Sequence, residues 1–361
     1  MAKKERMLII NPGSTSTKIA VYDEEAPLFV KTIAHEKEDL AGFSELFDQF
    51  GYRKELILKT MEENGVKKES LTVVVSRGGL LPPVPSGAFL VNDDICWQLR
   101  NKPQNEHASN LGAPIAKSIA DALELKAYIY DPVTVDEMSD VAKIAAFPEM
   151  RRKALDHPLN SRAIGHLFAG RKGVAFDSLT LIIAHLGGGF SISVCDKGRL
   201  IDVITDEEGP FSPERTGGLP LFQTLEWATS SGKNYKTLMK RVKNQGGLTA
   251  HLGTNDAREV ERRIAAGDAY AKLIYEAMAY GVAKSIGALS TVVSGKVDAV
   301  ILTGGVANSE MLMDWIRDRV SFIAPIEVIP GENEMEALAL GVLRVLRGEE
   351  EARVFRSPDR R

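Results

Sequence analysis

Two stretches of the sequence decide the fold: LIINPGSTSTKIAVYD at residues 8–23 and LIIAHLGGGFSISVCD at residues 181–196. In each, an apolar run leads through a turn of small residues into an alternating strand, which predicts a β-hairpin. A further strand pattern follows each hairpin, at residues 28–33 and 200–204. Two unrelated hairpins can look alike, but the second begins 173 residues after the first, without a gap, in a chain of 361 residues. This spacing favours an internal duplication.

A second pair of segments indicates a mixed α/β sheet in each half. Residues 71–75 form a β-branched run that ends at Arg77 and two glycines, and residues 299–302 form an apolar run that also ends at two glycines. Continuous apolar runs that end in glycines and feed helices are typical of such sheets.

Helical periodicity is clearest over residues 257–289, and it also predicts helices at residues 309–320 and 335–346. The charged end of the chain, residues 349–361, is expected to fray. The predicted domains are residues 1–140, completed by a C-terminal helix at residues 340–361, and residues 141–339.

The composition limits the possible functions. The chain is 44% hydrophobic and 26% charged, which allows two buried cores. A net charge of -4 gives no electrostatic case for nucleic acid, and no apolar run is long enough to span a membrane. The charged start does not resemble a signal peptide, and Cys96 and Cys195 form no CxxC motif. We therefore expect a cytoplasmic protein that binds neither nucleic acid nor membrane.

The turns of the two hairpins are candidate phosphate sites. The sequence has neither a Walker loop nor a dinucleotide fingerprint, so nucleotide binding must rest on other residues. Residues 11–18 combine backbone N–H groups, hydroxyls and one ammonium, which suits polyphosphate oxygens but fits an ordinary polar hairpin equally well. Gly187, Gly188 and Gly189 would weaken a strand, so the close approach of a ligand is a good reason for them. The pair of turns predicts a clamp for ATP.

Three motifs resemble the acetokinase family: the turn at residues 11–18, the His-Leu-Gly turn at residues 185–187 and the sequence DAREVE at residues 256–261. The likeness extends over essentially the whole chain. Within the family, residues 107–113 and 212–218 are similar to the butyrate kinases.

The resemblance implies an α/β fold of two duplicated actin-like (ribonuclease H-like) domains, each with a mixed sheet, and an ATP and substrate cleft between them. It implies a kinase that uses ATP/ADP and Mg²⁺ to phosphorylate a short-chain carboxylate reversibly, with butyrate giving its acyl phosphate, butanoyl phosphate. It also implies a homo-oligomer formed through the second domain. The alternatives are isobutyrate, acetate or propionate as substrate, a sugar kinase, and an actin-like ATPase without a metabolic substrate.

Physical chemistry explains which residues such an enzyme needs. A carboxylic acid is ionised at pH 7, so the nucleophile requires no general base. The difficulty lies in bringing an anion to a polyanion and stabilising the transition state, which arginine and a divalent metal do well. Arg77 and Arg215 each precede glycines that leave room around them. A single arginine is usually a surface ion-pair partner, and the resemblance is what favours a catalytic role for these two.

The resemblance assigns the remaining roles residue by residue. Asp131 matches the active-site aspartate and would orient Arg77 or a metal-bound water, and His157 matches a histidine that stabilises the transition state. His107 is a further candidate without an assigned role. The expected catalytic residues are Arg77, Asp131, His157 and Arg215. The expected metal ligands are Asn11 and Glu334. The expected nucleotide-binding residues are Ser14, Ser16, Lys18, His185, Gly187, Gly188, Gly189, Asp256, Arg258, Gly304, Gly305 and Asn308.

The chain departs from the acetate kinases at three points, of which the first removes a side-chain contact to phosphate and the other two bear on the acyl group. Gly188 replaces an asparagine, a bulky apolar residue after Arg77 is lost, and Asp156 replaces an aromatic residue before His157. The last two changes are compatible with room for a longer acyl chain. Each methylene is worth only about 1 kcal/mol, so we expect soft discrimination between chain lengths.

Overall fold

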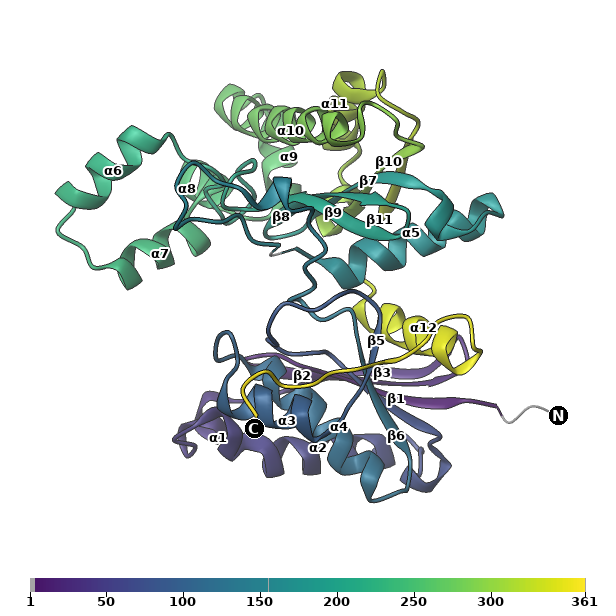
Figure 1. Cartoon of the computed structure of the whole chain (residues 1–361). Helices are drawn as coiled ribbons and strands as arrows, with labels where there is room; N and C mark the ends of the chain where they lie inside the picture. Colours follow the sequence, from purple (N-terminus) through teal and green to yellow (C-terminus); the bar gives the residue numbers. More distant parts are fainter. Residues whose placement is uncertain (1–3, 155, 361) are drawn as a thin grey trace. The chain divides into compact units, whose positions relative to one another are not determined.

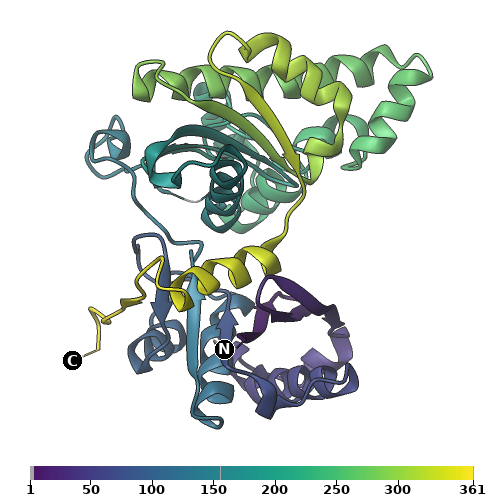
Figure 2. The same cartoon turned by 90° about the vertical axis from the view of Figure 1, so that its right-hand side faces the viewer.

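The computed structural model describes residues 4–154 and 156–360 and divides into two compact units (Figures 1 and 2). Unit 1 comprises residues 1–136 and 333–361, and unit 2 comprises residues 137–332. The chain thus leaves unit 1, forms unit 2 and returns to unit 1 with the segment drawn in yellow. The sequence placed these two changes at residues 140 and 340.

Among the residues described, unit 1 holds a seven-stranded mixed sheet in the order β12-β5-β6-β4-β1-β2-β3. Its strands are β1 (Arg6–Pro12), β2 (Ser16–Asp23), β3 (Ala26–Ala34), β4 (Val73–Ser76), β5 (Ala88–Leu90), β6 (Lys126–Tyr130) and β12 (Arg353–Val354). Its α-helices are α1 (Lys37–Ala41), α2 (Phe50–Glu63), α3 (Asp93–Asn101), α4 (Gly112–Asp121) and α12 (Glu334–Leu346).

Unit 2, as far as its residues are described, holds a five-stranded mixed sheet in the order β11-β10-β7-β8-β9. Its strands are β7 (Thr180–Leu186), β8 (Phe190–Asp196), β9 (Arg199–Ile204), β10 (Ala299–Gly304) and β11 (Ile326–Pro330). Its α-helices are α5 (Pro158–Lys172), α6 (Leu221–Ser230), α7 (Tyr235–Asn244), α8 (Gly247–Leu252), α9 (Ala257–Ala265), α10 (Ala269–Ser290) and α11 (Glu310–Val320).

The two sheets share a five-strand core, which confirms the duplicated mixed sheets that the sequence predicted. The order β6-β4-β1-β2-β3 in unit 1 recurs as β11-β10-β7-β8-β9 in unit 2. In both, the three strands of the meander are antiparallel and the two that follow are parallel. Each sheet even has a bulge at the corresponding place, between Val21 and Tyr22 in β2 and between Val194 and Cys195 in β8.

The pairing within the two hairpins differs by one residue, so the gap-free correspondence is wrong in detail. Leu8 pairs with Val21, whereas Leu181 pairs with Cys195 rather than with Val194. The second turn is shorter, because β7 and β8 remain paired up to the residues that flank its three glycines. A tighter turn needs residues without a side chain, which fits the composition of the turn.

The helical pattern predicted over residues 257–289 is confirmed, and one expectation about the end of the chain is wrong. The pattern comprises two helices, because Gly267 adopts a φ of +92° and Asp268 then caps α10 by accepting a hydrogen bond from the Ala271 N–H. Residues 353–355 do not fray, although the sequence predicted fraying over residues 349–361: β12 pairs with β5, and Phe355 is 7% exposed in the core of unit 1.

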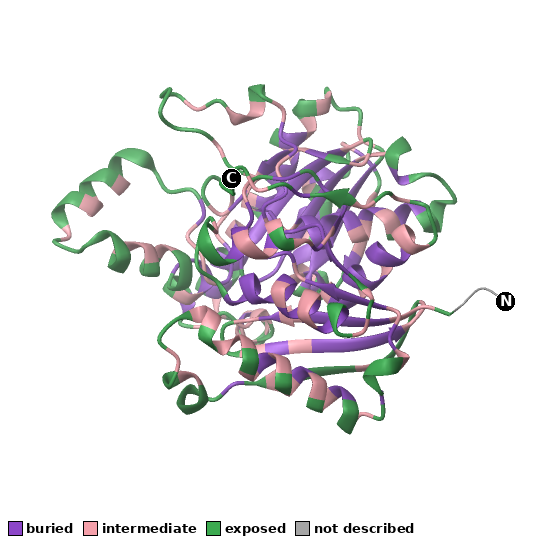
Figure 3. Cartoon of the chain, turned by 60° about the horizontal axis from the view of Figure 1, so that its bottom comes forward, coloured by how far each residue is buried: buried purple, intermediate pink, exposed green. Residues whose placement is uncertain are grey.

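Because successive side chains of a strand point to opposite faces of the sheet, the sheet of unit 2 has a hydrophobic cluster on each face. In β7, Ile182 and Ala184 face a cluster with α8 to α11, and Leu181 and Ile183 face a second cluster with Phe168 of α5. Figure 3 shows the buried strands as purple bands flanked by helices that are green on their outer faces. Helix α6 and helix α7 contain no buried residue among those described, and Figure 1 shows them as a hairpin at the margin of unit 2.

Helix α12 is a structural part of unit 1, although it lies more than 200 residues beyond its partner strands in sequence. It contacts β1, β4 and β6, and it buries Leu338, Ala339 and Val342. Gly341 allows the closest approach, since a Cβ at this position would lie 2.6 Å from the ring of Tyr130. Tyr130 is 1% exposed, so the contact lies in the interior of unit 1.

We predict that Gly341→Ala lowers the free energy of unfolding by about 1–3 kcal/mol, because the added methyl group overpacks the contact between α12 and β6. Gly287→Ala in α10 is the matched control, since a Cβ there meets no atom within 4 Å. This control should gain about 0.5–1 kcal/mol from the higher helix propensity of alanine. Chemical denaturation measures both free energies of unfolding. Equal changes in the two variants would contradict the close contact between α12 and Tyr130.

Candidate active site

Three predicted site residues meet at one edge of the sheet in unit 1. Strands β1 and β4 are parallel neighbours, so Asn11 near the end of β1 and Arg77 just after β4 lie at the same edge. Helix α12 begins there with Glu334. The Asn11 Nδ2 donates to Glu334 Oε2 at 2.7 Å, and the Arg77 Nη1 donates to Glu334 Oε1. One carboxylate therefore holds an amide and a guanidinium together.

The backbone around Arg77 is fixed by a close helix contact. A Cβ on Gly112, the first residue of α4, would lie 2.2 Å from Ser76 Oγ and 2.9 Å from the Arg77 carbonyl oxygen. Burial and the charge of Arg77 both lower the pKa of the His107 imidazole. Its Nδ1 accepts a hydrogen bond from the Ser109 N–H. Among the described residues, the only link between Arg77 and His107, for which the sequence gave no role, is this effect of charge.

Asp131 follows β6, the strand next to β4 in the sheet. It is fully buried, it has a φ of +39°, and its Oδ1 accepts a hydrogen bond of 2.6 Å from the Gly87 N–H. A non-glycine residue in this conformation is strained, which is common at functional sites. Pro132 packs against Gly78, so the segments that carry Arg77 and Asp131 are in contact. That Asp131 orients Arg77 stays a prediction.

The first turn presents polar groups at the same edge. Asn11 and Lys18 are directly paired across β1 and β2, which places their side chains on one face. Ser14 is exposed, whereas Ser16 and Lys18 are half-buried. Within residues 4–154 and 156–360, the Lys18 ammonium has no ion-pair partner. It is therefore available to a bound phosphate.

In unit 2, His157 and His185 come together although 28 positions separate them. Their rings stack with centroids 4.1 Å apart. The Nδ1 of His185 lies 2.9 Å from Asn160 Oδ1, and its Nε2 lies 3.2 Å from Glu332 Oε1. The hydrogen bond from His185 holds the pKa of Glu332 below its usual range. The Nδ1 of His157 lies 2.8 Å from Ser191 Oγ, so both rings are fixed by neighbours.

The three glycines of the second turn differ in what a side chain at each position would meet. A Cβ on Gly187 would lie 2.7 Å from Glu332 Oε1, and a Cβ on Gly189 would lie 2.5 Å from the Arg215 guanidinium carbon. The nearest atom to a Cβ on Gly188 would be Glu214 Oε2 at 3.7 Å, so this position is open. Close approach by the protein's own side chains therefore explains two of the glycines that the sequence attributed to a ligand.

Arg215 lies flat against the second turn. Its Nη1 donates to Asp206 Oδ2 at 2.8 Å, and its side chain is 36% exposed. The segment that carries it is tied to the same turn, because Ser212 Oγ donates to the Gly188 carbonyl oxygen at 2.6 Å. The guanidinium is thus held in place and remains accessible.

A cavity of about 340 Å³ opens beside this turn. Its lining includes Gly187 and Gly188, which follow β7, and Gly305, which follows β10. The two strands are close at this point, because a Cβ on Gly304, whose φ is +94°, would lie 2.4 Å from the Leu186 carbonyl oxygen. The cavity is lined by Gly187, Gly188, Pro213, Glu214, Asn255, Gly305, Val306 and Glu332.

Three expected nucleotide-binding residues lie close to this cavity in sequence without lining it. Asp256 caps α9 and forms an ion pair of 2.9 Å with Arg258, whose side chain is 88% exposed. Asn308 is exposed and donates to the Gly305 carbonyl oxygen. Their contacts to a nucleotide stay predictions.

Sequence reasoning missed four residues that shape the site in unit 2. Asp206 holds Arg215, Glu332 holds His185, and Glu214 with Asn255 forms one wall of the cavity through a hydrogen bond of 2.5 Å. Glu332 precedes Glu334 by two positions and could have been noticed as a second carboxylate. The others carried no signal beyond being polar residues next to glycine-rich turns.

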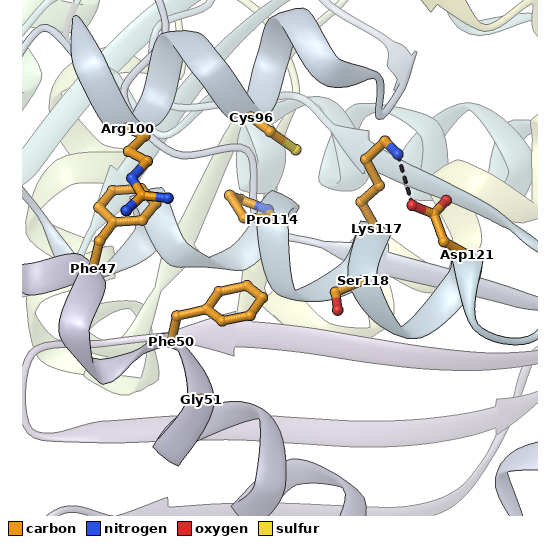
Figure 4. A pocket seen from close by; sticks show the side chains of 9 residues that line it. All are labelled: Phe47, Phe50, Gly51, Cys96, Arg100, Pro114, Lys117, Ser118 and Asp121. Atoms are coloured by element: carbon orange, nitrogen blue, oxygen red, sulfur yellow. Dashed lines mark hydrogen bonds and ion pairs between the residues drawn. The ribbon is translucent and has the colours of Figure 1, made fainter.

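Unit 1 has a further cavity, of about 540 Å³, that includes none of the predicted site residues (Figure 4). Phe47, Phe50 and Pro114 give it an apolar lining, and Lys117 at its margin is paired with Asp121 at 2.7 Å. Across the described ranges, no three His, Cys, Asp or Glu side chains form a metal-binding group. No helix among the described residues is long and apolar enough to cross a membrane.

Comparison with known proteins identifies the family. The model of the acetokinase family matches residues 168–332. Over 351 residues, the chain is 46% identical to the probable butyrate kinase 2 of Caldanaerobacter subterraneus subsp. tengcongensis, covering 97% of this chain and 99% of that protein. It is 45% identical over 353 residues to butyrate kinase 1 of Clostridium acetobutylicum, with the same coverage.

The chain belongs to the acetokinase family.

Solved structures of the family have the same fold. The acetate kinase of Porphyromonas gingivalis superposes with a TM-score of 0.76 at 17% identity and covers 95% of this chain and 100% of that one. The propionate kinase of Francisella tularensis superposes with a TM-score of 0.73 at 19% identity and covers 93% and 98%. The actin-like fold expected from the resemblance is thereby confirmed.

Proposed function

We propose that this member of the acetokinase family transfers the terminal phosphoryl group of ATP to the carboxylate of a short-chain fatty acid, with butyrate as the preferred acid. The observation that carries the reaction is the placement of Arg215 against Gly189 of the glycine turn. A fixed, accessible guanidinium beside a phosphate-type turn stabilises the charge of a phosphoryl group in transfer. The preference for butyrate rests on the near-full-length identity to proteins named butyrate kinases.

The two units contribute different groups to the proposed reaction. In unit 2, the cavity beside Gly187 and Gly305 suits the nucleotide, and the stacked His157 and His185 form a rigid surface next to the glycine turn. In unit 1, Arg77 is a cation for the carboxylate or the acyl phosphate. Because the acid is already ionised, none of these groups has to remove a proton.

Asn11 and Glu334 fit a Mg²⁺ ion that is held mainly by water and phosphate. This ion prefers oxygen ligands and commonly uses only one or two protein carboxylates beside a nucleotide. The Asn11 amide oxygen makes no hydrogen bond within the described residues, and the Glu334 carboxylate is next to it. When bound, the ion would neutralise phosphate charge. Self-association through the second domain stays a prediction.

The proposal predicts which acids the chain accepts. With ATP, Mg²⁺ and hydroxylamine to trap acyl phosphate, straight and branched acids from two to six carbons should give most hydroxamate at four carbons. The rate should fall by about tenfold or less for each methylene removed. EDTA should abolish the signal. ATP hydrolysis without hydroxamate from any acid would contradict the proposal and favour an actin-like ATPase without an acid substrate.

The glycine turn allows a separate test of Arg215. Gly189→Ala places a methyl group against the guanidinium, so it should displace Arg215 and lower kcat by about 100-fold. Gly188→Ala leaves Arg215 in place, because the nearest atom would lie 3.7 Å away, and it should act mainly on the KM for ATP. Steady-state kinetics separates the two effects. Unchanged kcat in Gly189→Ala would exclude a catalytic role for Arg215.

A further inference from the structure

A buried arginine lies beneath the first turn. Arg53 belongs to α2, and with Ile57 and Met61 it forms the buried stripe of that helix. Its residue is 1% exposed, a very unusual burial for a cation. Among the residues described, no carboxylate pairs with Arg53, and burial lowers the pKa of the guanidinium. An arginine placed here without an acidic partner needs another reason.

The reason lies in the turn between β1 and β2. The Arg53 Nη1 donates to the carbonyl oxygens of Gly13 at 2.9 Å and Ser16 at 3.4 Å, and its Nη2 donates to that of Ser14 at 3.3 Å. The Nη1 also donates to the Thr17 hydroxyl at 3.0 Å. The Nε donates to Gln49 Oε1 at 3.0 Å, which fixes the plane of the guanidinium.

The remaining bonds of the turn complete the same pattern. The Thr15 carbonyl oxygen accepts from the His35 N–H at 2.9 Å, and the Gly13 N–H donates to the Ser16 carbonyl oxygen at 2.7 Å. All four carbonyl oxygens from Gly13 to Ser16 are therefore engaged by donors of unit 1. In the described part of the chain, the N–H groups of Ser14 and Thr15 make no hydrogen bond, and both residues are exposed.

This division of donors and acceptors suits an anion. Carbonyl oxygens repel a phosphate, whereas free N–H groups in a turn attract it. Burial of the carbonyl groups against a cation thus leaves the turn with the polarity that phosphate needs. His35 supports the arrangement from the other side: its Nε2 lies 2.8 Å from the Thr17 hydroxyl, and burial and the charge of Arg53 lower its pKa to about 4, so it stays neutral.

We propose that Arg53 is a positioning residue that engages the carbonyl groups of the turn from Gly13 to Ser16 and so keeps the Ser14 and Thr15 N–H groups free to bind a phosphate of ATP. Arg53 does not touch the substrate. The inference rests on the proposed function in so far as that function requires a phosphate at this turn.

The test compares three variants of the full chain. Arg53→Met removes the charge and all the hydrogen-bond donors of the guanidinium. Arg53→Lys keeps the charge but loses the planar guanidinium, which donates to several carbonyl groups at once. Lys54→Met is the matched control, because Lys54 is the next residue of the same helix and donates to Ser118 Oγ at 2.7 Å, away from the turn. Isothermal titration with ATP and Mg²⁺, steady-state kinetics and thermal unfolding are measured for each.

We expect Arg53→Met to weaken ATP binding at least tenfold and to lower kcat/KM about 100-fold. Arg53→Lys should lie between this variant and the wild type, and Lys54→Met should stay within twofold of the wild type. A purely structural role would lower the melting temperature and leave the ATP affinity of the folded protein unchanged, which would overturn the proposal.

Two further outcomes are decisive. If Arg53→Met does not fold, Arg53→Lys decides, and wild-type ATP affinity in that variant overturns the proposal. If the wild type binds ATP but phosphorylates no acid, the proposed function fails, while the ATP affinities of the series still decide the role of Arg53.

Discussion

The return of the last helix to the first unit is the constraint on which the candidate site depends. Glu334 begins α12 and engages both Asn11 and Arg77, so one carboxylate joins β1, the residue after β4 and the start of α12. Packing fixes its position, since Gly341 brings α12 against the Tyr130 ring. Without this packing, Arg77 would lose its partner and the flexible side chain would no longer be aimed.

A second theme is the control of charge by groups that do not react. In unit 1, Arg53 engages carbonyl groups so that N–H groups remain for an anion. In unit 2, Asp206 holds Arg215 and Glu332 holds His185. Arg215, His185 and the N–H groups of the first turn are thus each held by a second group, and such preorganisation is the main way in which proteins assist phosphoryl transfer.

The duplication could be predicted from the sequence because strand periodicity is local and both copies keep it. The residues of the two turns could also be named, but Gly187 and Gly189 are explained by close contacts with Glu332 and Arg215 rather than by a ligand. The one-residue difference in register could not be predicted, because pairing depends on the length of the turn and not on the apolar pattern.

The supporting residues could not be found for a different reason. Arg53 occupies a position of the apolar stripe of α2, and a single cation in a helix is ordinarily read as exposed. Asp206 and Glu332 act on residues that are adjacent only in space. The closure of β12 on β5 likewise depends on a pairing more than 250 residues apart in sequence, which no local pattern encodes.

A double-mutant cycle between Arg77→Lys and Glu334→Gln tests the central claim most directly, with kcat/KM for ATP and butyrate as the measured quantity. If the two residues act as one unit, the double variant should lose little more activity than the more damaged single variant, because the second change removes a group that has already lost its partner. Losses that multiply, as for independent residues, would contradict the account.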